Sequence, residues 1–221
     1  MLSYLKDFGL RSVGVVTLND TSRANLEAMN AALAALAIVP KVSVTIDRNA
    51  TSFEGRANEL LAGKLDCVLF TANAAPVARI IDLMRTANYP GLFYASSFAG
   101  QDLLDTLTAK KHGCVMSMVV PRPTALGVNV VAQCQRDLAL LNNGARLGLT
   151  TLEGYIAGRT AIEATQQALK GGGINRARLK EVLAGLRSDF GGYKVEFSSG
   201  NTQGSRFVDL IALDRHGRLV G

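Results

Sequence analysis

Short polar side chains follow three apolar runs of this sequence, where they could hold a small polar ligand. Hydroxyl, amide and carboxylate groups of this kind fix the orientation of a small molecule in a pocket. Two of the three groups also lead into predicted helices, whose free N-terminal amides could receive a carboxylate. The candidate ligand-binding residues are Asn19, Asp20, Thr71, Ala72, Asn73, Ser96, Ser97 and Phe98.

A structural interpretation stays open for several of these positions and their neighbours. Thr21, Ser22 and Asn73 are residue types that cap helix N-termini. Phe98 could be an ordinary packing residue. The hypothesis of a site therefore depends on the groups coming together in the fold.

Residues for catalysis do not form a recognisable motif. His112 and His216 are the only histidines, and neither lies in a nucleophile–base pattern. Asp82, Asp102 and Asp105 lie on predicted helices and are more simply solvated. We therefore expect no enzymatic activity, no cofactor and no catalytic residue.

The three cysteines, Cys67, Cys114 and Cys134, have no metal-like spacing, and their number is odd. Cys67 and Cys114 lie in apolar runs, which is typical of small core residues. We expect neither a disulfide nor a metal ion at these positions.

A formal net charge of +6 raises the question of nucleic acid binding. The basic residues are scattered, and the clusters Lys110-Lys111 and 176–180 have no interleaved aromatic residues. No apolar stretch reaches the roughly 18 residues of a membrane span. We therefore expect no nucleic acid partner and no membrane insertion.

The elements that must position the polar groups alternate over the first 123 residues. Apolar runs predict strands, and apolar stripes at helical spacing predict helices between them. One helix begins with a predicted capping box from Thr51 to Glu54. The alternation predicts right-handed crossovers and a parallel sheet with the polar groups along one edge. The predicted strands cover residues 13–18, 42–46, 66–70, 92–95 and 115–120.

From about residue 124 the pattern indicates helices without a convincing strand. Predicted helices cover 126–141 and 152–169, and a third runs from an Asn175 cap to Leu186. The glycine tract 171–173 follows a helix and precedes no Gly-Lys-Ser/Thr motif. We interpret it as a connection between helices rather than a phosphate-binding loop.

The C-terminal end returns to β structure, with predicted strands at 194–197 and 206–213. We therefore predict three segments. An α/β lobe covers residues 1–123, a helical segment covers 124–192, and returning β strands over 193–221 complete the α/β lobe.

Four stretches carry a family likeness in their order and spacing. They read FGLRSVGVV followed by Asn19-Asp20, LFTANAAP continuing to Tyr89-Pro90-Gly91, LEGYIAGR, and F-x-x-GN-x-QGS-x-FVD. This ordered set resembles the type I periplasmic solute-binding proteins of the leucine/isoleucine/valine (branched-chain amino acid) ABC-transporter family. The agreement extends over nearly all of the 221 residues.

The resemblance implies an α/β fold: a parallel-sheet lobe with helices on both faces, plus a helical segment and C-terminal β strands. It also implies a small-molecule ligand, an ABC-transporter permease as partner and a periplasmic location. The N-terminus lacks the pattern of a signal peptide. A cytoplasmic location is therefore expected if the sequence is the full natural protein.

The sequence begins where the second lobe of this family would begin, so most of the first lobe is expected to be missing. In the family, the helices that match residues 152–186 pack on the sheet of the first lobe. Their apolar faces would lack that partner here, and exposed apolar patches generally find another surface. We therefore expect a homodimer formed through the helical segment.

The ligand expected from the resemblance is an amino acid or a small carboxylate. Family members that bind amino acids pair an acidic side chain of the second lobe with the ligand ammonium. The best-matching loop here, Ser96-Ser97-Phe98, has no carboxylate, so an aromatic or aliphatic carboxylate suits it equally. The predicted function is small-molecule binding related to ABC-type uptake, weakened by the missing lobe. The alternative is a truncated, non-transport relative that acts as a dimeric interaction or sensor domain.

Overall fold

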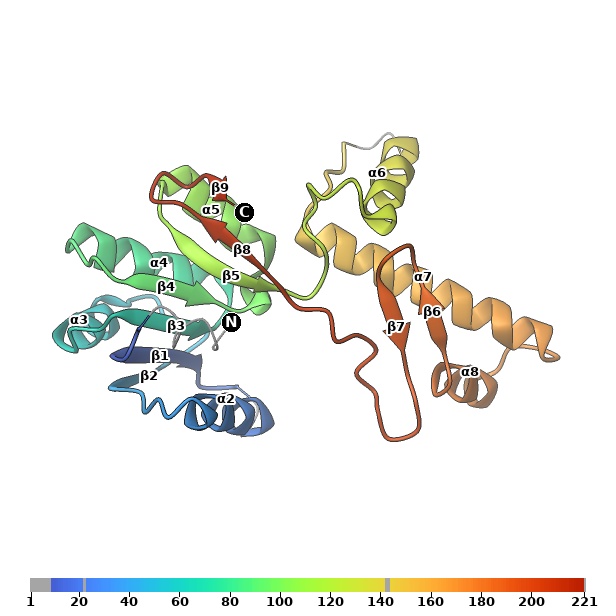
Figure 1. Ribbon diagram of the computed structural model, residues 1–221, viewed down its shortest axis with the longest axis horizontal. Coiled ribbons are helices and arrows are strands. Elements are labelled where there is room, and N and C mark those ends of the chain that lie inside the picture. Colours follow the sequence, from blue (N-terminus) through green and yellow to red (C-terminus); the bar gives the residue numbers. More distant parts are fainter. Residues whose placement is uncertain (1–8, 22, 142–143, 221) are drawn as a thin grey trace. The chain divides into compact units, whose positions relative to one another are not determined.

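The structure is a computed structural model that describes residues 9–21, 23–141 and 144–220 (Figure 1). The chain forms two compact units. The first consists of the chain up to Ser117 together with the chain from Leu210 onward, and the second is Met118–Asp209. None of the described helices is long and apolar enough to cross a bilayer.

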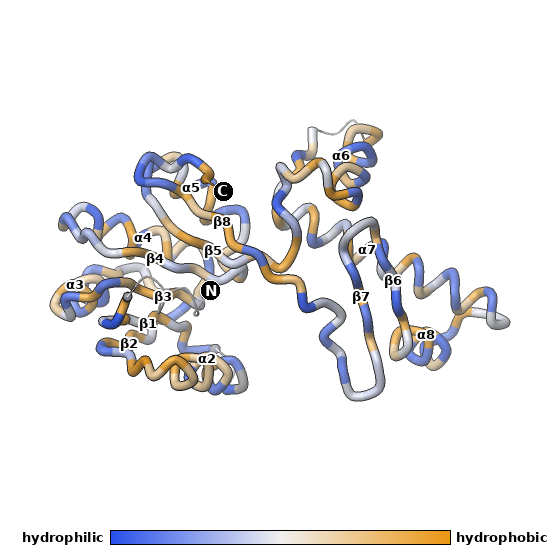
Figure 2. The backbone as a smooth tube through the Cα atoms, in the orientation of Figure 1, coloured by the Kyte–Doolittle hydropathy of each residue, from blue (hydrophilic) through white to orange (hydrophobic). Residues whose placement is uncertain are grey.

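A seven-stranded sheet forms the centre of the first unit, with the order β2-β1-β3-β4-β5-β8-β9. The first five strands are parallel, and β8 and β9 form an antiparallel pair. Figure 2 shows the apolar character of β5 and β8. The strands are β1 (Val13–Leu18), β2 (Val42–Ile46), β3 (Cys67–Thr71), β4 (Leu92–Ala95), β5 (Cys114–Met118), β8 (Asp209–Leu213) and β9 (Leu219–Val220).

Every residue of β1 is buried, because helices cover both faces of the sheet. On one face, Leu33 of α2 (Arg23–Ala35) packs with Val15, Leu69 and Tyr94. On the other face lies α3 (Glu54–Ala62), whose Leu60 approaches the backbone of Gly14. Next to α3 follow α4 (Ala74–Thr86) and α5 (Gly100–Lys110), with the short 3-10 helix η1 (Ser97–Ala99) before α5. The predicted fold class is confirmed.

The second unit combines three helices with a β-hairpin. Its helices are α6 (Asn129–Leu141), α7 (Leu149–Lys170) and α8 (Arg176–Leu183). The hairpin pairs β6 (Arg187–Asp189) with β7 (Lys194–Glu196) in antiparallel register. The predicted cap of α8 is confirmed, because the Asn175 side chain accepts a hydrogen bond from the backbone amide of Arg178 at 2.8 Å.

The predicted capping box at Thr51 is wrong. Helix α3 begins at Glu54 with Phe53 in the N-cap position, and the Phe53 side chain offers no cap. The Glu54 carboxylate instead accepts hydrogen bonds from the Ser52 hydroxyl at 2.8 Å and from the backbone amide of Phe53 at 3.1 Å. These contacts lower the pKa of Glu54 to about 2, with the Ser52 hydrogen bond as the largest cause.

The returning β segment also differs from its prediction. Residues 193–209 belong to the second unit, so the units divide at 117/118 and 209/210 rather than at 123/124 and 192/193. The reason is that β7 pairs with β6, a strand that was not predicted, while β8 begins only at Asp209.

The buried cysteines confirm the prediction of core positions. Cys67 is fully buried and Cys114 is 4% exposed, and all three thiols are free. Burial raises the pKa of Cys67 and of Cys114 to about 12.

Candidate functional site

A cavity of about 480 Å³ opens in the first unit where β1, β3 and β4 end. We call it the strand-end cavity. Strand β2 lies on one side of β1 and β3 lies on the other, so the winding direction of the sheet changes there. Open parallel sheets bind their ligands beyond the strand ends at such a switch point. The cavity is lined by Leu18, Asp20, Thr21, Asn25, Ala28, Arg48, Thr71, Ser96 and Phe98.

Four of the eight predicted site residues line this cavity, namely Asp20, Thr71, Ser96 and Phe98. They come from three separate loops, and the parallel strands bring these loops to one edge. Phe98 is 59% exposed, so it is not an ordinary core residue. The structure thus brings together one half of the predicted set.

The other four predicted residues have structural environments outside the lining. Asn19 donates from its amide to the Asp47 carboxylate at 2.9 Å, which joins the loops after β1 and β2. Ala72 is fully buried. Asn73 occupies the N-cap position of α4, but its side chain makes no capping hydrogen bond. The backbone amide of Ser97 donates to the Ser117 hydroxyl at 3.2 Å.

Arg48 and Asp20 form a two-point ion pair at the cavity. The Nε of Arg48 lies 2.7 Å from Oδ2 of Asp20, and its Nη2 lies 3.2 Å from Oδ1. The same guanidinium lies 5.9 Å from the centre of the Phe98 ring. The hydrogen bond lowers the pKa of Asp20 and raises that of Arg48, so both groups are held in their charged forms.

Two buried oxygens near this edge have no hydrogen-bond partner within the described part of the chain. They are the Oγ of Ser96 and the Oδ1 of Asn73. A buried polar atom without a partner costs free energy, so its retention asks for an explanation. Ser96 is also one of the residues that line the cavity.

Arg48 is the charged side chain of the cavity lining that was not predicted from the sequence. It comes two residues after β2, just as Asp20 comes two residues after β1. Since β1 and β2 are parallel neighbours, the loops that follow them share one edge. The loop after β2 therefore carries the same positional signal as the loops that follow β1, β3 and β4.

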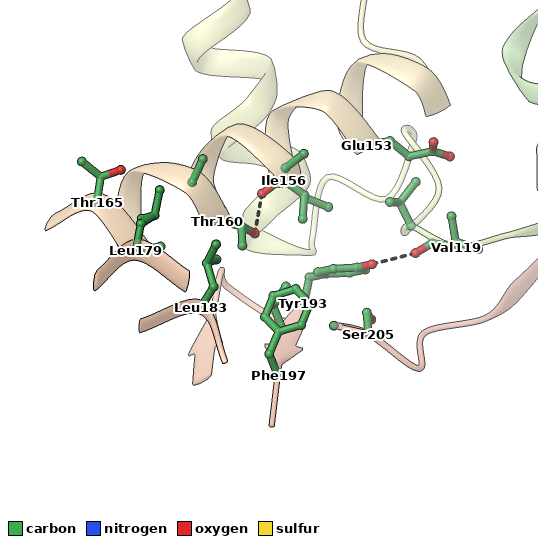
Figure 3. A pocket seen from close by; sticks show the side chains of 16 residues that line it. Val119, Glu153, Ile156, Thr160, Thr165, Leu179, Leu183, Tyr193, Phe197 and Ser205 are labelled. Carbon is green, nitrogen blue, oxygen red and sulfur yellow. Dashed lines mark hydrogen bonds between the residues drawn. The ribbon is translucent and has the colours of Figure 1, made fainter. Parts of the chain in front are cut away.

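A second cavity, of about 450 Å³, lies within the second unit between α7, α8 and β7 (Figure 3). We call it the helix–hairpin cavity. Its polar side chains are largely engaged: the Tyr193 hydroxyl donates to the Val119 carbonyl at 2.9 Å, and the Thr160 hydroxyl donates to the Ile156 carbonyl at 2.8 Å. Its lining is mostly apolar or small, with Val119, Val120, Ile156, Ala157, Ala161, Ala164, Leu179, Leu183, Val195 and Phe197.

Glu153 is the one carboxylate among the residues that line the helix–hairpin cavity. Burial raises the pKa of this carboxyl. Further apolar side chains lie exposed on α7 and just after it: Ile162 is 56% exposed, Leu169 is 57% exposed and Ile174 is 51% exposed. Helix α7 and the residues that follow it therefore expose several large apolar side chains.

Across the described residues, no group of three or more His, Cys, Asp or Glu side chains is placed to hold a metal ion.

No protein-family model matches the sequence, and no curated protein matches it.

Solved structures of periplasmic binding proteins match the whole chain. A substrate-binding periplasmic protein from Ralstonia solanacearum is 21% identical, with a TM-score of 0.85. A possible leucine/isoleucine/valine-binding protein from Rhodopirellula baltica is 22% identical, with a TM-score of 0.85. An ABC transporter substrate-binding protein from Aeropyrum pernix is 19% identical, with a TM-score of 0.82.

These matches cover 99–100% of this chain but only 60–64% of the three matched chains. The chain thus spans less than two thirds of the length of the structures that it resembles. The expected likeness is confirmed at the level of the fold. Over that length, the chain has the fold of the type I periplasmic binding proteins.

Proposed function

We propose that the chain binds a small polar molecule, an amino acid or a small carboxylate, in the strand-end cavity. The observation that carries this proposal is the meeting of Arg48 and Asp20 with the hydroxyls of Thr71 and Ser96 at the switch point of a parallel sheet. Charged and hydroxyl groups from separate segments of the chain converge there.

The charge pattern supports this ligand class. A guanidinium fork matches a carboxylate in two-point geometry, and the Asp20 carboxylate can accept from an ammonium group. The exposed ring of Phe98 offers an apolar contact beside these charges. Asn19, Ala72, Asn73 and Ser97 support the loops that carry the site.

The proposed biological role is solute capture for ABC-type uptake in the periplasm, with a transporter permease as partner. The likeness to proteins described as periplasmic and as ABC transporter substrate-binding proteins supports this role. The chain spans 60–64% of those three structures, so part of their fold lies outside it. We therefore expect weak binding by this chain alone.

A calorimetric titration of the purified protein with amino acids and with small aliphatic and aromatic carboxylates tests the proposal. One ligand class should bind with a single-site isotherm, and Arg48→Gln should weaken it by about tenfold or more. Arg56→Gln is the matched control, because Arg56 pairs with Glu59 on α3, away from the cavity lining. The absence of binding by folded protein, or an equal loss in both variants, would contradict the proposal.

The apolar surface of the second unit favours a second candidate function, a dimeric interaction. We propose that a second copy of the chain covers the helix–hairpin cavity and the exposed side chains of α7. An apolar patch of this kind on a soluble protein usually marks an interaction surface. A symmetric pair would bury the same patch twice.

Light scattering over a range of protein concentrations tests this second proposal. A dimer should form, and Ile162→Glu should shift it towards monomer. Val39→Glu is the control, because Val39 is 84% exposed in the first unit. A monomer at all concentrations, or an equal effect of both variants, would contradict the dimer.

A further inference from the structure

Basic side chains gather at the edge of the sheet opposite to the strand-end cavity, where β4 and β5 begin. They line a cavity of about 340 Å³ in the first unit, which we call the basic cavity. Its basic residues come from the α4–β4 loop, the α5–β5 loop and the β8–β9 turn. They are Arg85, Lys111, His112 and Arg215.

Arg85 is held in place by the protein but forms no ion pair with an acidic side chain among the described residues. Its Nη1 donates to the Tyr89 carbonyl at 2.5 Å, and its guanidinium lies 4.4 Å from the centre of the Phe93 ring. Burial lowers the pKa of Arg85, and the nearby charge of Arg215 lowers it further. Placing a half-buried cation beside a second cation costs free energy, unless an anion neutralises the two positive charges.

The backbone presses the β8–β9 turn against the α5–β5 loop. A Cβ at Gly113 would lie 3.1 Å from the carbonyl oxygens of Leu213 and Asp214. A Cβ at Gly217, where φ is +73°, would lie 2.8 Å from the Thr108 carbonyl oxygen. This close packing, together with the hydrogen bonds from the backbone amides of His216 and Arg218 to the Asp214 carboxylate, holds the turn that carries Arg215 at the same cavity as Arg85.

The neighbouring carboxylates are occupied by other cations. Asp82 accepts from the ammonium of Lys110 at 2.8 Å and contacts Nε2 of His112 at 3.0 Å. Asp214 is bound by Arg218 of the same turn, at 2.8 Å. Within the described residues, neither carboxylate forms an ion pair with Arg85, Lys111 or Arg215. The cavity therefore keeps an excess of positive charge.

We propose that the basic cavity binds a small oxyanion that carries more than one negative charge, of the phosphate or pyrophosphate type. Two guanidinium groups and an ammonium group line the cavity, and such groups donate charge-assisted hydrogen bonds to phosphoryl oxygens. The volume of about 340 Å³ suits a small free anion. This site is separate from the strand-end cavity and does not depend on the ligand proposed there.

A calorimetric titration with inorganic pyrophosphate and with phosphate, at constant ionic strength set with chloride, tests the proposal. Pyrophosphate should bind at one site and raise the melting temperature with increasing dose. The double variant Lys111→Gln/Arg215→Gln should lose about tenfold or more in affinity, because both side chains are exposed and can be replaced without disturbing the core. Arg85→Lys should also weaken binding while the protein stays folded, since it keeps the charge but loses the fork.

The control Arg23→Gln/Arg56→Gln removes the same number of charges from exposed positions of α2 and α3. It should leave pyrophosphate affinity within about twofold of the parent, because nonspecific attraction is screened by salt. An equal loss in the control, or no binding beyond chloride, would overturn the site. Retention on vesicles with anionic phospholipid, without affinity for free pyrophosphate, would overturn it as well. Arg48→Gln should leave pyrophosphate binding intact, so this test is independent of the strand-end cavity.

Discussion

The guanidinium of Arg48 reaches from the loop after β2 to the carboxylate of Asp20 in the loop after β1, with contacts of 2.7 and 3.2 Å. The two side chains remain 42% and 49% exposed. Water screens an ion pair of this kind, so the pair contributes little to folding. Its two charges can instead be shared with a ligand in the cavity that they line.

This pair allows the two ligand classes to be distinguished by Asp20→Asn. The substitution removes the competitor for Arg48, so affinity for a simple carboxylate should rise. Affinity for an amino acid should fall by about tenfold, because its ammonium loses the acceptor. Parallel titrations with a carboxylate and the matching amino acid measure the difference, and an equal change for both would leave Asp20 a structural residue.

Ser96→Ala tests whether the buried hydroxyl is retained for a ligand. The Oγ of Ser96 has no hydrogen-bond partner within the described chain, so its removal should leave the free energy of unfolding unchanged or raise it by up to about 1 kcal/mol. Binding in the strand-end cavity should weaken. Urea denaturation and calorimetry give the two quantities, with Ser43→Ala on an exposed position of β2 as the control. A clear loss of stability would show that the hydroxyl has a structural partner.

Two glycine substitutions should act in opposite directions. Gly217→Ala should destabilise the protein by about 1–3 kcal/mol, because φ is +73° and the new Cβ would meet the Thr108 backbone at 2.8 Å. Gly158→Ala, within α7, meets nothing within 4 Å and should stabilise by about 0.5–1 kcal/mol. Chemical denaturation followed by circular dichroism checks both signs.

The Asp214 carboxylate predicts a pH dependence of the β8–β9 turn. Hydrogen bonds from the backbone amide and the side chain of Arg218 lower its pKa to about 2, from an ordinary value of 3.8. A lowered pKa stabilises the fold above the unfolded value, and this contribution is lost as the pH falls from about 4 towards 2. Asp214→Asn should therefore flatten the stability curve in this window. Asp102→Asn, which removes an exposed carboxylate of α5, is the control in acid titrations followed by fluorescence or circular dichroism.

The parallel lobe was predictable because each of its signals is local. The buried run Val13–Leu18 and the apolar stripe that contains Leu33 each fold as their spacing predicts. Parallel strands then place their following loops on one edge without further information. This is why Asp20, Thr71 and Ser96 could be grouped from the sequence alone.

The less predictable parts depend on contacts between distant residues. Strand β6 has only three residues and becomes a strand because Ser188 pairs with Val195. The Glu54 carboxylate accepts a hydrogen bond from the Ser52 hydroxyl instead of taking part in a capping box with Thr51. Helix propensity does not distinguish these two local geometries at the start of the helix. The pairing of Arg48 with Asp20 requires the order of the strands, which the spacing of apolar residues does not contain.

The first unit is built from two segments that are separated in the sequence by the second unit, and this has a consequence for synthesis of the chain on the ribosome. Strand β5 ends at Met118, but the strand that lies beside it in the sheet, β8, begins at Asp209. The growing chain must therefore carry an open sheet edge while about ninety further residues are translated, and exposed edges invite pairing with other chains. Strands β8 and β9 close this edge only after the second unit has been translated, so deletion of residues 209–220 should reduce the yield of soluble protein more than the small length of that segment suggests.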